Sequence, residues 1–134
     1  MPTDAQPVIL SKPMLWAGGI ITSLVVLFLA FDGVTKIIRV APVVEASEKL
    51  GLPPYTILGI GMVLLACTII YAVPQTAVLG AILLTGYLGG AAAIHVRAGS
   101  GVFPVVFSIA FGVLAWVGLV LREPRLFKMI LLRQ

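Results

Sequence analysis

The sequence predicts an all-α membrane protein: a four-transmembrane-helix antiparallel bundle with a short interfacial helix after the first span and an amphipathic C-terminal anchor. Of its 134 residues, 60% are hydrophobic and 10% are charged, and the mean hydropathy is +1.16. Soluble domains carry about 25% charged residues. The apolar residues also fall into four stretches close to the ~20 residues that cross a ~30 Å hydrocarbon layer. These spans leave no room for a soluble domain, so residues 1–134 are expected to form a single membrane-embedded domain.

The first span is expected at about residues 14–38. Trp16 near its start suits the headgroup layer, where amphipathic rings are favoured. Asp32 and Lys36 stand four residues apart near its end, a spacing that lets them pair on one side of a helix. We therefore expect Asp32 just inside the membrane, with Lys36 extending its charge towards water. A neutralised rim pair and a functional site both fit this pattern.

The segment PVVEASEKLG predicts a short helix between Pro42 and Gly51. Proline suits the first helical turn and glycine suits the position after the last one. Glu45 and Lys49 share its polar face, and the other face is apolar. This pattern favours a helix that lies flat at the membrane interface.

The second and third spans are expected at about residues 56–73 and 76–96. Pro74 and Gln75 make so tight a turn between them that the two spans must be antiparallel neighbours. The third span is rich in small residues, and such strips let membrane helices approach closely. The strip expected to serve helix packing consists of Gly86, Gly89, Gly90 and Ala93.

Two hydroxyl groups accompany this strip. Thr85 and Tyr87 are candidate contacts for a buried ligand. Thr85 has an equally plain alternative, because a threonine hydroxyl can bond back to a carbonyl of its own helix.

The fourth span is expected at about residues 102–121. After Glu123 and Pro124 comes RLFKMILLRQ, in which basic and apolar residues alternate. It is too short to span a bilayer and is typical of a basic interfacial anchor.

The basic residues are almost evenly divided between the two sides of such a bundle. The side of the termini holds Lys12, Arg122, Arg125, Lys128 and Arg133, and the opposite side holds Lys36, Arg39, Lys49 and Arg97. A basic amphipathic tail gains about 1 kcal/mol per charge near anionic cytoplasmic lipid. Both termini are therefore expected in the cytoplasm.

Spans one and three run in the same direction, so the polar residues at their ends meet at one rim. These residues are Asp32, Lys36, His95 and Arg97. Ionisable residues within a membrane are functional candidates. His95 is the one histidine; it could relay protons, hold a quinone or a haem, or hydrogen-bond Asp32. A metal site is not predicted, because a lone histidine has only carboxylates nearby.

The composition also bears on other classes of function. The net charge of +4 comes from residues at the ends of apolar spans, so it indicates a membrane protein and not one that binds nucleic acid. The single cysteine, Cys67, excludes an intramolecular disulfide and CxxC chemistry. The sequence shows no nucleophile–base pair or metal cluster, so whether the chain is an enzyme stays open.

Three segments resemble the DoxX-like family of small bacterial four-helix membrane proteins: FDGVTKI, PVVEASEKLG and TAVLGAILLTGYLGGAAAIHVR. The resemblance implies a multi-pass bundle in the bacterial cytoplasmic (inner) membrane. It also implies a relation to proteins associated with thiosulfate:quinone oxidoreductase subunits and with membrane oxidoreductase complexes in oxidative-stress defence. The partners expected on this basis are the lipid bilayer, oxidoreductase proteins and further copies of the chain.

The leading hypothesis is an accessory subunit that binds a quinone-like or other lipophilic molecule at the rim, through His95, Asp32 and Lys36. One alternative is a small transporter or proton-coupled channel in which Asp32 and His95 form a relay. Another is structural assembly through the glycine strip.

Overall fold

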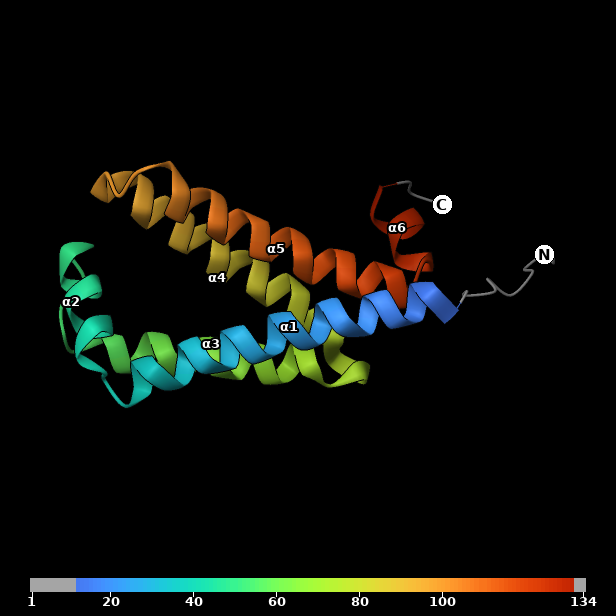
Figure 1. Cartoon of the computed structure of the whole chain (residues 1–134), viewed down its shortest axis with the longest axis horizontal. Coiled ribbons are helices and arrows are strands. Elements are labelled where there is room, and N and C mark those ends of the chain that lie inside the picture. The colour runs from blue at the N-terminus through green and yellow to red at the C-terminus, as the bar shows by residue number, and fades with distance from the viewer. Residues whose placement is uncertain (1–11, 132–134) are drawn as a thin grey trace.

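The computed structural model describes residues 12–131, and within them the secondary structure is helical throughout, with no strand (Figure 1). The elements are α1 (Lys12–Ile37), α2 (Ala41–Lys49), α3 (Thr56–Ala72), η1 (Pro74–Thr76), α4 (Ala77–Ala98), α5 (Val102–Arg122) and α6 (Arg125–Leu131). Their bounds agree with the expected segments to within two residues at most helix ends, because proline and glycine mark several of them.

Three segments are long and apolar enough to cross a membrane: α1, the continuous stretch formed by η1 and α4, and α5. The chain is therefore an all-α, multi-pass membrane protein. The expected second span corresponds to α3, an apolar helix of 17 residues. At 1.5 Å per residue it is about 25 Å long, somewhat less than the hydrocarbon core of a typical bilayer.

The four apolar helices form a ring in which α1 and α4 occupy opposite corners. Helix α1 packs against α3 and α5, and α4 packs against the same two helices. Figure 1 shows the pair α1 and α3 diverging from the pair α4 and α5 towards the end where α2 lies. We call this the open end and the opposite one, where α1 begins, the closed end. Helices α1 and α4 both finish at the open end.

The pair α1 and α3 approaches the pair α4 and α5 most closely towards the closed end (Figure 1). A Cβ atom added to Gly80 would lie 2.3 Å from the backbone nitrogen of Tyr71, and one added to Gly118 would lie 2.7 Å from Thr22 Oγ1. Tyr71 is fully buried, and its hydroxyl donates a hydrogen bond of 2.6 Å to the carbonyl oxygen of Ala115. Here α4 meets α3 and α5 meets α1 at the level of the backbone, which glycine permits.

The expected packing strip on α4 is not where the helices of this chain meet. Within residues 12–131, no atom of another helix lies within 4 Å of a Cβ added to Gly86, Gly89 or Gly90, and Ala93 is exposed. The bundle instead contacts another face of α4, whose buried residues are Ala77, Gly80, Ala81, Leu84, Leu88 and Ala92. Contact of the strip with a second copy of the chain stays a prediction.

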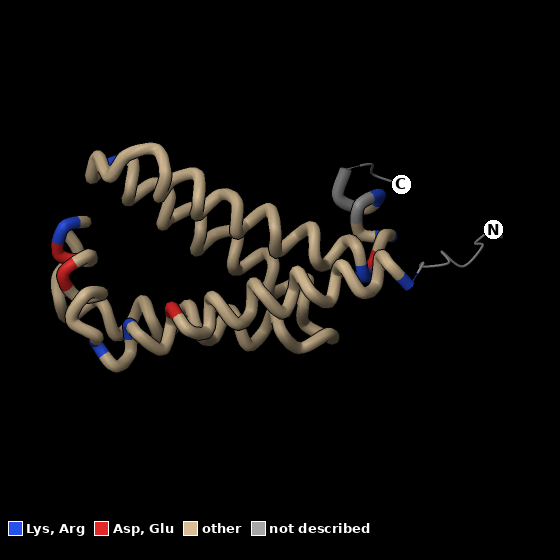
Figure 2. Tube along the Cα trace, viewed as in Figure 1, with Lys and Arg blue, Asp and Glu red and all other residues tan. Residues whose placement is uncertain are grey.

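Helix α2 lies at the open end between two left-handed residues. Arg39 before it has φ 56° and Gly51 after it has φ 79°. Its polar residues Glu45 and Lys49 are exposed, as the amphipathic pattern predicts. Figure 2 shows that charged residues gather towards the two ends of the bundle and leave its middle uncharged. In α6 the expected basic residues Arg125 and Lys128 are exposed, and Arg133 lies outside the described residues.

Candidate ligand cavity at the open end

A cavity of about 610 Å³ lies at the open end, lined mainly by α1, α2, α4 and α5, with Ile60 of α3. Ligand cavities in proteins are mostly 300–1,000 Å³ and combine apolar walls with a few convergent polar groups. The polar side chains of this cavity come from four helices: Asp32, Lys36, Ser47, Tyr87, His95 and Ser108. The cavity therefore has the size and the mixed lining of a small-molecule site.

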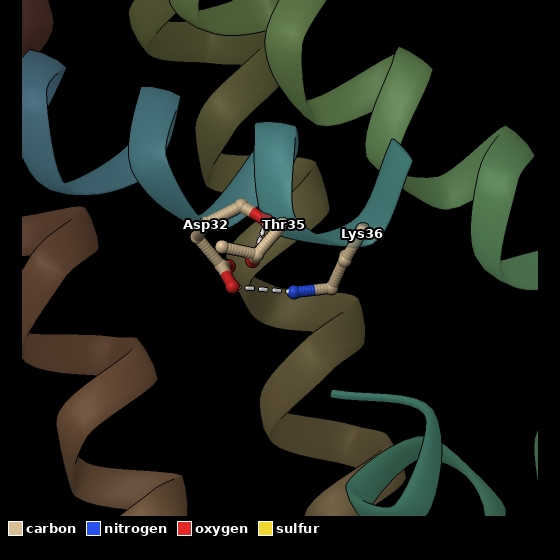
Figure 3. Close-up of polar contacts among 3 residues, drawn as sticks. All are labelled: Asp32, Thr35 and Lys36. Carbon is tan, nitrogen blue, oxygen red and sulfur yellow. Dashed lines mark hydrogen bonds and ion pairs between the residues drawn. The ribbon is translucent and has the colours of Figure 1, made fainter. Parts of the chain in front are cut away.

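Asp32 and Lys36 form an ion pair on the last turns of α1. Lys36 Nζ lies 2.6 Å from Asp32 Oδ1, and the Thr35 hydroxyl donates to the Asp32 backbone oxygen at 2.8 Å (Figure 3). The lysine side chain is 18% exposed and the aspartate side chain 34%. Figure 3 shows both side chains directed away from α3 and towards the side of α4. The pair thus presents a neutralised but strongly polar group to the cavity.

His95, on the last turn of α4, lines the same cavity and has a buried nitrogen. Its Nδ1 atom has no hydrogen-bond partner among the described residues. A buried polar atom without a partner costs about 1–3 kcal/mol. No hydrogen bond to Asp32 is formed by the described atoms, so the two side chains meet the cavity separately from opposite corners of the ring. His95 therefore borders the cavity with one imidazole nitrogen that no described residue satisfies.

A cluster of phenylalanines forms one wall of the cavity. The ring of Phe28 on α1 stands 5.5 Å from that of Phe107 and 4.5 Å from that of Phe111, both on α5. Phe103 extends the row, at 5.6 Å from Phe107. These distances are typical of interacting aromatic pairs. This wall is not among the features predicted from the sequence, although the four-residue spacing of Phe103, Phe107 and Phe111 is a visible signal.

Some of the remaining candidate residues line the cavity, and the others lie outside it. Tyr87, Gly86 and Gly90 line the cavity, whereas Gly89 and Ala93 do not. Thr85 lies outside the lining; its hydroxyl donates to the Ala81 carbonyl at 2.7 Å and accepts from Trp116 Nε1 at 2.7 Å. That second bond joins α4 to α5, so the Thr85 hydroxyl serves the bundle.

Arg97 also lies outside the lining and connects the open end to α2. Its Nη2 atom donates to the carbonyl oxygen of Leu50 at 3.3 Å, just beyond the last residue of α2. Leu50 lines the cavity together with Val43 and Ala46, which lie on α2. Arg97 therefore links α4 to the end of α2, the helix that lines one side of the cavity.

The described residues of this region do not bring together a set of metal ligands. Across residues 12–131, no group of three or more His, Cys, Asp or Glu side chains stands close enough to hold a metal ion. The single cysteine, Cys67, is buried in the core.

Comparison with known proteins identified one family. A model described as the DoxX-like family matches residues 20–118. A search of curated proteins and a search of solved structures each found no match. The matched segment covers every residue that lines the cavity, from Phe28 to Phe111.

Proposed function

The chain belongs to the DoxX-like family of membrane proteins, and we propose that it is an accessory membrane subunit that binds a quinone-like, lipophilic molecule in the cavity at the open end. One observation carries the proposal: a single cavity joins an aromatic wall to a polar end that contains an ion pair and an unpartnered imidazole nitrogen.

The lining suits a molecule with a flat polar ring and an apolar body. A quinone ring has carbonyl oxygens that accept hydrogen bonds, and the Lys36 ammonium group and the His95 imidazole are donors at the polar end. The faces and edges of Phe107 and Phe111 suit a planar ring. When bound, a quinone would supply two-electron redox chemistry; the chain itself binds and orients it, and oxidoreductase partners are expected to exchange the electrons.

The proposed placement in the membrane follows the expectations from the sequence. Helix α3 is the fourth span, and α2 and α6 lie at opposite interfaces of the bacterial cytoplasmic membrane. Both ends of the chain face the cytoplasm, because Arg125 and Lys128 on α6 are exposed where anionic lipid would attract them. The cavity then lies near the opposite surface, and the gathering of charges towards the two ends of the bundle supports this arrangement. The chain acts as one domain.

The test is a titration of decylubiquinone into the protein in lipid nanodiscs, followed by calorimetry. Wild type is expected to bind, and His95→Ala is expected to weaken binding about 3- to 10-fold, the worth of one hydrogen bond. Phe107→Leu should also weaken it. Phe31→Leu is the matched control, because Phe31 is 70% exposed and lies outside the cavity. Absence of binding by wild type would refute the proposal.

A second candidate function is supported by Asp32 and His95, which line the same cavity although they come from α1 and α4, at opposite corners of the ring. A small transporter or proton-coupled channel would need two such titratable groups along its path. Proteoliposomes distinguish the candidates: a pH gradient that dissipates with wild type and persists with Asp32→Asn favours transport, and equal dissipation with and without protein excludes it.

A further inference from the structure

Two glycines on α4 leave part of the cavity wall without side chains. Gly86 and Gly90 both line the cavity, one helical turn apart, and Ile94 continues the same row towards the open end. We propose that Gly86 and Gly90 form a seat for the apolar body of the ligand, which lies lengthwise along α4 with its polar end at His95 and Lys36. This inference rests on the proposed function and deepens it, because it assigns the ligand to elongated amphipathic molecules.

The glycines of this seat differ from those that pack helices together. At Gly80 and Gly118 an added Cβ would collide with Tyr71 or Thr22 at 2.7 Å or less, so neighbouring helices occupy the space. At Gly86 and Gly90, no atom of another described helix lies within 4 Å of such a Cβ. Glycine within a helix is costly, and close approach of the backbone to a ligand is one use that offsets the cost. Because both residues line the cavity, the open space beside them includes part of it.

The length of the seat defines the ligand further. Gly86 and His95 are nine positions apart, which corresponds to about 13–14 Å along the axis of a helix. A compact ring held at His95 would not reach Gly86. A ring or other polar head that carries an apolar chain would extend along Ile94 and Gly90 as far as Gly86. The far wall is apolar and aromatic, with Phe107 and Phe111.

The experiment compares leucine at three neighbouring positions. Gly86→Leu and Gly90→Leu place a side chain in the seat, whereas Gly89→Leu adds the same side chain outside the lining, where an added Cβ also meets no described atom of another helix within 4 Å. Decylubiquinone is the probe, and ubiquinone-0, which has the same ring without the chain, is the second probe. Gly86→Leu and Gly90→Leu should lower the affinity for decylubiquinone about tenfold or more, as overfilled cavities do. Gly89→Leu should stay within about twofold of wild type, because it leaves the cavity unchanged.

The apolar tail of the ligand is the feature that the glycine seat is proposed to recognise. Wild type should therefore prefer decylubiquinone to ubiquinone-0, and the Gly86→Leu and Gly90→Leu variants should show a smaller preference. Leucine favours helix formation over glycine, so folding is not expected to suffer. Should a leucine variant still fail to fold, Gly86→Ala is the replacement and should show a smaller loss of the same kind.

The outcomes separate the two proposals. If wild type binds neither probe, the proposed function fails together with this inference. If wild type binds decylubiquinone and the variants at positions 86, 89 and 90 bind it equally well, only the inference fails. Light scattering supplies a further check: a loss of oligomers in the Gly86→Leu and Gly90→Leu variants would assign the strip to contact between copies and overturn the seat.

Discussion

Replacing Lys36 with glutamine tests how deeply the ion pair of the cavity lies. Lys36 neutralises Asp32 at 2.6 Å, and Asp32 stands five residues before the end of α1, about 7–8 Å along its axis. An unpaired carboxylate at the centre of a bilayer costs about 2.5–3.5 kcal/mol. Because the Asp32 side chain is 34% exposed and close to the helix end, we expect solvent screening to reduce the cost of Lys36→Gln to about 1–2 kcal/mol.

The double variant Asp32→Asn/Lys36→Gln removes both charges and should cost less than the single variant. Without the lone carboxylate, the loss falls to that of an exposed helical pair, about 0.3–0.5 kcal/mol. Lys49→Gln on α2 is the control, because Lys49 is exposed and i,i+4 to Glu45, and it should change the stability by less than about 0.5 kcal/mol. Denaturation by SDS in mixed micelles measures all three. A double variant that is no more stable than Lys36→Gln, or equal stability of the Lys36→Gln and Lys49→Gln variants, would show that Asp32 is fully hydrated and refute the reasoning.

Two further predictions concern the closed end and α2. Gly80→Ala should destabilise the bundle by about 3 kcal/mol or more, because its methyl group would meet the Tyr71 backbone at 2.3 Å. Gly86→Ala is the control and should be nearly neutral, because its methyl group meets no described atom of another helix within 4 Å. Equal losses of stability in the same SDS titration would contradict the assigned contacts. Arg97→Gln should speed amide hydrogen exchange in α2 several-fold without changing global stability, because it removes the bond to Leu50. Unchanged exchange would show that α2 is held by its apolar face alone.

The order of the elements could be predicted from local signals. Pro74 permits the tight turn between α3 and α4, and Gly51 and Gly99 end helices with the positive φ that glycine tolerates. The parallel course of α1 and α4 then places Asp32 and His95 at the same end, which topology alone dictates. The sequence could place these side chains at one end but not determine whether they share a cavity.

The rotation of each helix about its axis could not be predicted in the same way. In water, an amphipathic pattern shows which face is buried; a membrane helix is apolar towards lipid and towards its neighbours, so the pattern is weak. The pattern therefore predicts packing at the strip around Gly86, whereas the α4 glycine that meets another described helix is Gly80. The hydrogen bond between Thr85 and Trp116 could not be predicted for the same reason, because it depends on how α4 and α5 are rotated relative to each other.

The contrast between the two ends of the bundle has a consequence for how the ligand preference of such a protein can change during evolution. At the closed end the helices are in contact at the level of the backbone, and residues such as Gly80 and Gly118 admit no larger side chain. At the open end the walls include side chains such as Phe107 and His95, which border open space on one side, so that their replacement changes the shape of the cavity. One scaffold can therefore acquire new ligand preferences through single substitutions, while the joint that holds it together stays constant.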